Sequence, residues 1–322
     1  MSTTGRLKLV FCGTPRFAVP TLEALLDAGH EIALVVSQPD RPVGREQQLT
    51  APPVKQTALA HGLEVTQPEK IRDNADFRAQ LEAIRPDAIV VVAYGRIIPP
   101  WMLALPRLGC INLHASLLPK YRGAAPIQWA VANGDAVTGN TTMLIDEGLD
   151  TGPVLMQRTE PIGPDETAAE LFERLAIAGA PLVVETLESL AAGTLQPQPQ
   201  NSQLASYAPM LTREDGRMNF AARTAHQLCD RWRGFQPWPG AFTTFDGKKL
   251  IVHRMTVAAR PSGAGSEPCE PGRICVRDHR LFVCCAASTW LELGEVQLEG
   301  KKRLKADEFL RGSPFADGAR LG

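Results

Sequence analysis

The chain has 322 residues, 44% of them hydrophobic and 21% charged, which is enough apolar material for two domains or one large one. This composition excludes a wholly disordered chain, and no apolar run approaches the ~20 residues that cross a bilayer. The formal net charge is −1, but the charge is uneven along the chain. It is −6 before Ala208 and +5 from Ala208 onward, where 18 basic and 13 acidic side chains lie. This asymmetry indicates either a polyanionic partner for the basic part or chance variation between two solvated surfaces.

Strand-like and helix-like segments alternate over the first two hundred residues. Short apolar runs predict strands at Leu7–Cys12, Ile32–Ser37, Ala88–Ala93, Leu108–His114 and Thr141–Ile145. Helical spacing of apolar residues predicts helices near Phe17–Leu26, Pro52–His61, Phe77–Ile84, Ala125–Ala132 and Glu166–Leu190. The alternation predicts an α/β fold with a doubly wound, mostly parallel sheet, whose ligands lie beyond the carboxyl ends of its strands.

The pattern changes after a polar, proline-containing stretch at residues 193–207, which we interpret as a linker. One helix is predicted beyond it, at His226–Arg233. Five short strands follow, at Ala241–Phe245, Leu250–Val257, Gly272–Val276, Leu281–Ala286 and Trp290–Leu298. We therefore expect a first domain at residues 1–192 and a small β-barrel domain at residues 208–322.

Signatures of common cofactors and metal sites are missing from the sequence. The first strand is followed by GTPRFA, which is neither a dinucleotide-binding nor a P-loop pattern. The seven cysteines include no C-x-x-C pair, so no metal site is expected. Their odd number favours reduced thiols, and with no signal-peptide pattern we expect a cytoplasmic protein without a membrane anchor.

The densest polar cluster follows the strand that ends at His114. Strand alternation places Asn112 and His114 on the same face, and His114 at the end where the ligand crevice is expected. An imidazole there can act as a general base, and the carboxamide can donate a hydrogen bond to a developing oxyanion. Alternatively, both side chains only complete the polar end of a strand.

A second polar cluster, residues 146–153, follows the strand ending at Ile145. Two glycines in it, Gly148 and Gly152, permit a tight loop. The carboxylate of Asp150 is then able to orient His114 and stabilise its protonated form, unless the segment is a simple solvent-facing turn.

These segments resemble the methionyl-tRNA formyltransferase family over nearly the whole chain. The resemblance is carried by FCGTPRFAVP, SQPDRPVGR, LTAPPVK, VVAYGRIIP, GCINLHASLLPKYRGAAPIQWA, MLIDEGLDTG, FQPWPGAFTTFDG and EGKKRLKADEFLRG. It implies a Rossmann-like domain and a C-terminal OB-like β-barrel. It also implies transfer of a formyl group from 10-formyltetrahydrofolate to the free α-amino group of methionyl initiator tRNA in translation initiation, by direct attack through a tetrahedral intermediate.

The resemblance also implies roles for individual residues. Asn112, His114 and Asp150 match the family's catalytic trio. The tetrahydrofolate site would be formed by Ser116, Leu117, Leu118, Pro119, Tyr94, Gly95, Ile97, Gly148 and Leu149. Arg45 matches a basic residue in a loop that contacts the acceptor end of the tRNA. Relatives often carry lysines after it, whereas this chain has Glu46-Gln47-Gln48.

The C-terminal domain is expected to supply the RNA-binding surface of a monomer that binds the acceptor arm. Candidate phosphate contacts are Lys248, Lys249, Arg254, Lys301, Lys302, Arg303 and Lys305. Each of these alone is more often a solvated surface residue, so the prediction concerns the group.

Three alternative functions remain open at this point. Formyltransferases that act on glycinamide ribonucleotide or an amino sugar share the Asn-x-His pair. A formyltetrahydrofolate hydrolase domain also carries the SLLP segment. An RNA-binding module without catalytic activity is the third alternative, and retention of all three polar side chains argues against it.

Overall fold

The computed structural model describes residues 5–44, 47–262, 264, 269–312, 315 and 319–322. The chain divides into two compact units. Unit 1 comprises Met1–Pro126, Val137–Pro161 and Glu170–Pro209. Unit 2 comprises Ile127–Ala136, Ile162–Ala169 and Met210–Gly322, so it includes two segments from the first two hundred residues.

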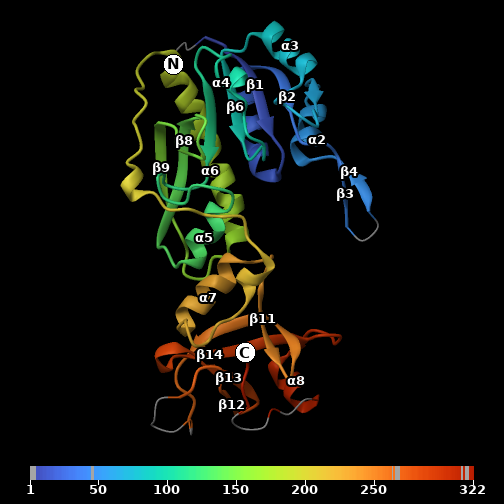
Figure 1. Ribbon diagram of the computed structural model, residues 1–322, viewed down its shortest axis with the longest axis vertical. Helices are drawn as coiled ribbons and strands as arrows, with labels where there is room; N and C mark the ends of the chain where they lie inside the picture. Colours follow the sequence, from blue (N-terminus) through green and yellow to red (C-terminus); the bar gives the residue numbers. More distant parts are fainter. Residues whose placement is uncertain (1–4, 45–46, 263, 265–268, 313–314, 316–318) are drawn as a thin grey trace. The chain divides into compact units, whose positions relative to one another are not determined.

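Unit 1 is built on a seven-stranded sheet with the order β5-β2-β1-β6-β7-β8-β9 (Figure 1). The strands are β1 (Lys8–Gly13), β2 (Glu31–Val36), β5 (Val65–Thr66), β6 (Ala88–Val92), β7 (Cys110–His114), β8 (Val137–Leu144) and β9 (Val154–Pro161). The first five in the spatial order are parallel, and β8 and β9 run antiparallel to their neighbours. The predicted doubly wound, mostly parallel sheet is confirmed, although β9 was not predicted.

Helices cover both faces of this sheet. They are α1 (Val19–Asp27), α2 (Pro53–Ala60), α3 (Ala75–Ile84), α4 (Pro100–Leu103) and α6 (Ala168–Ala191). The side chain of Asn74 caps α3 by accepting a hydrogen bond from the Phe77 N–H at 3.0 Å. On α6, a Cβ at Gly179 would lie 2.8 Å from Leu113 Cδ2, so glycine lets the helix approach β7. No helix in the described ranges combines the length and apolar character needed to cross a membrane.

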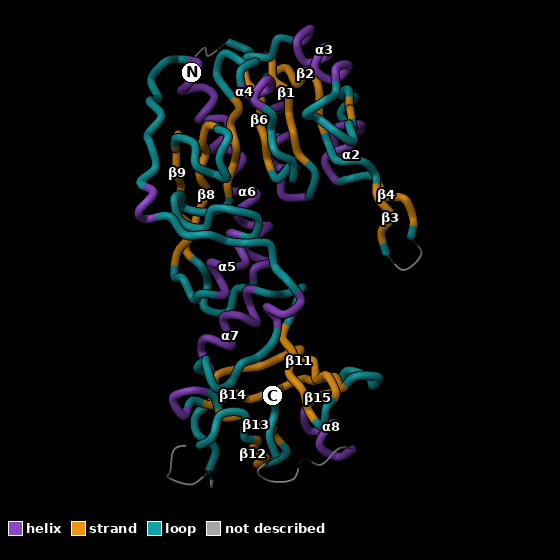
Figure 2. Tube along the Cα trace, in the orientation of Figure 1, coloured by secondary structure: helices purple, strands orange, loops and turns teal. Residues whose placement is uncertain are grey.

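Unit 2 contains an antiparallel six-stranded sheet with the order β10-β11-β14-β13-β12, and β15 pairs with β14 (Figure 2). Its strands are β10 (Ala241–Phe245), β11 (Lys248–Ala258), β12 (Ile274–Arg277), β13 (Arg280–Cys284), β14 (Trp290–Leu298) and β15 (Leu304–Lys305). Three helices belong to it: α5 (Pro126–Ala132), α7 (Ala225–Gly234) and α8 (Ala306–Gly312). All five predicted strands are present, which confirms a strand-rich C-terminal domain.

A two-stranded hairpin extends away from the unit 1 sheet beside α2 (Figure 1). It consists of β3 (Arg41–Val43) and β4 (Gln48–Thr50), and its Leu49 side chain is exposed. Sequence analysis treated this segment only as a loop. Arg45, the predicted tRNA contact, and Glu46 lie outside the described residues.

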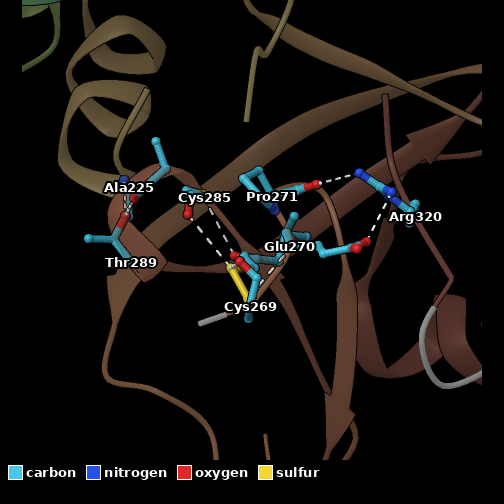
Figure 3. The surroundings of a disulfide bond; sticks show 10 residues. Ala225, Cys269, Glu270, Pro271, Cys285, Thr289 and Arg320 are labelled. Atoms are coloured by element: carbon cyan, nitrogen blue, oxygen red, sulfur yellow. Dashed lines mark hydrogen bonds and ion pairs between the residues drawn. A yellow bond between two sulfur atoms is a disulfide. The ribbon is translucent and has the colours of Figure 1, made fainter. Parts of the chain in front are cut away.

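Cys269 and Cys284 form a disulfide, which corrects the prediction that all seven cysteines are reduced. Backbone hydrogen bonds from Gly272 N–H to Cys284 O and from Cys284 N–H to Arg273 O place the preceding segment beside the end of β13. The two Cα atoms are 6.4 Å apart. Figure 3 shows Arg320 fixing the same segment, through Glu270 Oε2 at 3.0 Å and the Pro271 carbonyl at 3.2 Å. Contacts between such separate segments depend on the tertiary fold, so the number and spacing of the cysteines could not predict this disulfide.

We expect the remaining five thiols to be unreactive in the folded protein. Burial raises the pKa of Cys110, Cys229 and Cys285 to about 12, and it raises the pKa of Cys12 well above its ordinary value. Because the thiolate is the nucleophile, Ellman's reagent at pH 8 should label almost none of them in the native state. Denaturation without reductant should release five thiols, and reduction should raise the count to seven. Seven thiols before reduction would contradict the disulfide.

Candidate active site

The predicted catalytic residues meet at the carboxyl end of β7. Asn112 pairs with Val91 of β6 and with Met143 of β8, in the middle of the sheet. His114 pairs with Thr141 at the end of the same strand. As predicted, strand alternation places both side chains on one face, while Leu113 on the other face packs toward α6.

The Asn112 side chain is half-buried, and its carboxamide has no hydrogen-bond partner within the part of the chain that the structure describes. An amide group carries two N–H donors and a carbonyl acceptor. The amide atoms are open to solvent and are not sealed in the core, so a ligand can reach them. Asn112 can therefore donate a hydrogen bond to an oxygen of a bound molecule.

His114 is buried, with 6% of its surface exposed. Its Nε2 lies 2.9 Å from the carbonyl oxygen of Tyr121, and its Nδ1 lies 3.8 Å from Asp150 Oδ2. Because a carbonyl oxygen only accepts, Nε2 carries the hydrogen and the neutral ring has its lone pair on Nδ1. Nδ1 is therefore the atom able to take up a proton, and it faces the carboxylate.

The carbonyl of Tyr121 is held by a second segment of the chain. Tyr121 has a left-handed backbone (φ 61°), and its N–H donates to Ser206 Oγ at 2.9 Å. The next residue, Arg122, forms a parallel bridge with Tyr207. Sequence analysis missed Tyr121 because the group that acts is a backbone carbonyl, which leaves no signal in residue type.

Asp150 approaches His114 from the loop that follows β8. Its Oδ2 accepts a hydrogen bond from the Gly123 N–H at 2.8 Å, and its backbone is left-handed (φ 52°). Two residues further on, a Cβ at Gly152 would lie 1.8 Å from the Leu144 carbonyl oxygen, so only glycine allows the loop to pack against β8. The structure thus brings together Asn112, His114 and Asp150, although they come from two segments.

The loop of residues 146–152 is closed by its own polar contacts. Asp146 accepts hydrogen bonds from the Gly148 N–H at 3.0 Å and from Thr151 Oγ1 at 2.8 Å. This arrangement leaves the Leu149 side chain 62% exposed. Gly148 and Leu149, both predicted folate contacts, therefore lie in a well-defined loop with an apolar side chain facing outward.

The predicted folate motif, Ser116 to Pro119, forms a turn held by β8 and β9. The Ser116 hydroxyl is buried and donates to the Lys120 carbonyl at 2.6 Å, while the Ser116 carbonyl accepts from Thr141 Oγ1 at 2.6 Å. Gln157 Nε2 donates to the Leu118 carbonyl at 2.9 Å. Ser116 and Leu118 are buried, whereas Leu117 and Pro119 remain partly exposed for contact with a ligand.

The remaining predicted folate residues follow β6. Tyr94 is buried in the core, and burial raises the pKa of its hydroxyl well above the ordinary value. Its carbonyl accepts from Thr14 Oγ1 at 3.2 Å and from Gln38 Nε2 at 3.1 Å. Gly95 has φ 78°, and the Ile97 side chain is 78% exposed. The Tyr94 carbonyl is therefore already used within the protein, whereas the Ile97 side chain is free to contact a ligand.

A cavity of about 600 Å³ opens next to these residues, within the size range of small-molecule sites. It lies at the ends of β1, β2 and β6 and reaches the β3–β4 hairpin. Its lining includes Thr14, Pro15, Gln38, Arg41, Thr50, Tyr94 and Arg96. Sequence analysis did not identify Thr14 or Gln38, although their position directly after β1 and β2 is where parallel sheets bind ligands. Across the described ranges, no group of three or more histidine, cysteine or acidic side chains could hold a metal ion.

Four of the predicted RNA contacts gather at one end of the unit 2 sheet. Lys248 and Lys249 begin β11, and Lys301 and Lys302 follow β14. The Glu299 N–H donates to the Lys249 carbonyl at 2.8 Å, which joins the two turns. Lys249 Nζ lies 3.9 Å from the centre of the Phe242 ring.

The predicted contact Arg303 lies beyond them and is ion-paired with Glu295. Arg254 and Lys305 line a separate groove of about 410 Å³ that also contains Glu292 and Glu295. Acidic side chains therefore share the positions of these three predicted contacts. By contrast, the four lysines at the end of the sheet form no ion pair among the described residues.

Comparison with known proteins covers nearly the entire chain. Residues 7–187 match the family described as formyl transferase, and residues 210–314 match the formyl transferase C-terminal domain. The chain is 65% identical over 316 residues to a methionyl-tRNA formyltransferase of Acidobacterium capsulatum, covering 98% of this chain and 100% of the relative. It is 56% identical to a methionyl-tRNA formyltransferase of Koribacter versatilis, covering 98% of each chain.

Solved structures share the fold at low sequence identity. An N-formyltransferase from Helicobacter canadensis in complex with folinic acid and dTDP-3-aminofucose matches with a TM-score of 0.64 at 19% identity, over 89% of this chain and 98% of that one. HypX from Aquifex aeolicus in complex with tetrahydrofolic acid matches with a TM-score of 0.60 at 17% identity, over 99% of this chain and 51% of that one. These matches establish the architecture independently of the close relatives.

Proposed function

This chain belongs to the methionyl-tRNA formyltransferase family, and we propose that it transfers the formyl group of 10-formyltetrahydrofolate to the α-amino group of methionyl initiator tRNA. The observation that carries the proposal is the free carboxamide of Asn112 beside the His114–Asp150 pair at the carboxyl end of β7. We place the reaction in translation initiation, in the cytoplasm, with the enzyme acting as a monomer.

The amine of the aminoacyl ester is the nucleophile. An α-amino group titrates near ~8, so a usable neutral fraction exists at pH 7. The amine attacks the formyl carbon directly, through a tetrahedral intermediate, and Asn112 donates a hydrogen bond to the oxygen as it becomes negative. Collapse of the intermediate breaks the bond between the formyl carbon and N10 of the folate, and N10 takes up a proton and leaves as tetrahydrofolate. No covalent bond to the enzyme is formed.

His114 accepts a proton at Nδ1, while its Nε2–H remains bonded to the Tyr121 carbonyl. The Asp150 carboxylate, 3.8 Å away, stabilises the positive charge that the ring then carries. The sequence analysis expected Asp150 both to orient His114 and to stabilise its protonated form; orienting the ring includes the choice of tautomer. The Tyr121 carbonyl makes that choice, so the role of Asp150 is electrostatic.

The residues around this centre are suited to 10-formyltetrahydrofolate, which is consumed as a substrate. The side chains of Ile97 and Leu149 are apolar and exposed, and leaving them in water costs free energy. Both can pack against the flat ring system of the folate. The backbone of Gly95 and the carbonyl of Gly148 are available to read its polar edge, whereas the Tyr94 carbonyl already accepts two hydrogen bonds and the Gly148 N–H already donates one. Leu117 and Pro119 add a partly exposed apolar ledge beside them.

The acceptor end of the tRNA is assigned to the neighbouring cavity and the β3–β4 hairpin. Arg41 and Arg96 line this cavity, and both carry the positive charge that a phosphate requires. Arg45, which lies between β3 and β4 in the sequence, is proposed to contact the acceptor arm. Residues 1–192 are proposed as the catalytic and folate-binding domain and residues 208–322 as the tRNA-binding domain. The proposed linker, residues 193–207, is packed within unit 1.

Neutralising Lys301 and Lys302 together with Arg303 is expected to raise KM for the tRNA while leaving KM for the folate unchanged. Each lost phosphate contact should reduce the slope of binding against salt concentration by about 1. Because Arg303 is already paired with Glu295, Lys301→Gln/Lys302→Gln should produce most of the effect. Steady-state kinetics at several salt concentrations measure it, with exposed Lys70→Gln of unit 1 as the control. Unchanged tRNA binding by the triple variant contradicts this surface.

The proposed function is tested by supplying labelled 10-formyltetrahydrofolate with one acceptor at a time. Formyl transfer to methionyl initiator tRNA supports the proposal. Transfer only to glycinamide ribonucleotide or an amino-sugar nucleotide would instead support the small-amine enzymes, and folate release without any acceptor would support a hydrolase. Binding of tRNA without turnover would leave only an RNA-binding role.

A further inference from the structure

Gln200 joins the segment 198–208 to the loop that carries Asp150. Its Nε2 donates to the carbonyl oxygens of Asp150 at 2.9 Å and Gly152 at 2.7 Å. Its Oε1 accepts from Nε and Nη2 of Arg122, at 3.1 and 2.7 Å. Both N–H groups and both lone pairs of the amide are therefore used. Figure 2 shows the segment running past β9, where Gln198 pairs with Val154, with a short helical turn at Ser202–Leu204.

Arg122 determines which way the amide of Gln200 points. It is only 3% exposed, and its rigid guanidinium can donate but not accept. The oxygen of Gln200 must therefore face Arg122, and its nitrogen must face the Asp150 loop. The backbone of Arg122 is itself fixed, since its N–H donates to the Ser206 carbonyl at 2.8 Å and its carbonyl accepts from Ala208 at 2.7 Å.

The loop needs this support because Asp150 has a left-handed backbone, which is costly for a residue other than glycine. The Gly123 N–H holds its carboxylate, and Gln200 holds its peptide group on the other side. We propose that Gln200 is a positioning residue that sets the Asp150 carboxylate against Nδ1 of His114. This inference rests on the proposed function, because it assigns Gln200 to the same reaction.

The replacement Gln200→Glu tests the proposal with little change in shape. The carboxylate still accepts from Arg122, but it presents oxygen instead of N–H to the carbonyls of Asp150 and Gly152. We expect kcat for formyl transfer to fall about 10- to 100-fold, as a misplacement near 1 Å produces, with KM for both substrates unchanged. Gln198→Glu is the matched control, since that side chain is exposed in the same segment, and it should keep wild-type kcat.

A double variant separates positioning from a general structural effect. If Gln200 acts through Asp150, Gln200→Glu should cause no further loss of kcat in an Asp150→Asn background. The same fold loss in both backgrounds, or full kcat in Gln200→Glu, would overturn the proposal. The apolar Gln200→Met provides a second variant without added charge, and failure of both variants to fold, monitored by thermal unfolding, would also overturn it. If the wild-type enzyme and Gln198→Glu transfer no formyl group to methionyl-tRNA, the proposed function itself fails.

Discussion

Replacing Asn112 by alanine is expected to lower kcat about 10²- to 10³-fold, the usual cost of removing one oxyanion donor. The carboxamide has no partner in the described parts of the chain, so the substitution breaks no internal hydrogen bond. Its hydrogen bond strengthens only as the formyl oxygen becomes negative, so kcat should fall while KM for either substrate changes little. Single-turnover transfer to methionyl-tRNA measures this loss directly.

Two further replacements sharpen the assignment of Asn112. Asn112→Leu keeps the volume and removes the donor, so it should resemble Asn112→Ala. Asn112→Asp places a negative charge beside the developing oxyanion, and its kcat should be lower still. Asn219→Ala, at an exposed position of unit 2, serves as a control with wild-type kcat. An Asn112→Ala enzyme with normal kcat would remove the carboxamide from the mechanism.

The sequence predicted the residues whose placement depends on local periodicity. Asn112 and His114 share a face because they are two residues apart on a strand, and that strand was recognisable from its apolar pattern. Asp150 was predicted because a glycine-containing loop follows a strand at the ligand-binding edge of the sheet. In both cases a short segment contains all the information that the prediction requires.

The contacts that orient these residues were not predictable in the same way. Tyr121 acts through a backbone carbonyl, and it is fixed by Ser206, which is 85 positions away along the chain. Gln200 lies in a segment whose composition indicates only a flexible linker, yet it reaches Asp150 across 50 positions. Pairing over such separations depends on the tertiary fold, and neither a propensity nor a motif records it.

The strand β9 was missed for a related reason. After the buried Leu155 its residues alternate between half-buried and exposed, with Arg158 and Glu160 among them, so its only apolar run is the three residues Val154–Met156. It forms one end of the sheet, where polar side chains reach solvent, and its only other backbone partner in the described residues besides β8 is Gln198, beside Val154. The same two strands run antiparallel, which a pattern of alternating strands and helices does not predict.

Replacing His114 by alanine is expected to lower kcat about 10²- to 10⁴-fold, the range of general acid–base catalysis. Nδ1 is the atom with a free lone pair, and no imidazole is among the described residues that line the neighbouring cavity, so no second ring there can replace it. Removing only the carboxylate, in Asp150→Asn, should cost less, because the ring can still accept the proton without its stabilising charge. The two variants together therefore separate proton transfer from its electrostatic support.

Chemical rescue distinguishes loss of the proton acceptor from loss of structure. The substitution His114→Ala leaves a space next to the Tyr121 carbonyl. Added imidazole can occupy this space and donate a hydrogen bond to that carbonyl, as the native ring does. Imidazole should restore part of kcat in His114→Ala and none in Asn112→Ala, which lacks a hydrogen-bond donor and not a base. The same substitution at His253, whose ring contacts Gln297 in unit 2, should leave kcat unchanged. Full kcat in His114→Ala without imidazole would show that the proton leaves the amine by another route, because this variant has no lone pair at the position of Nδ1.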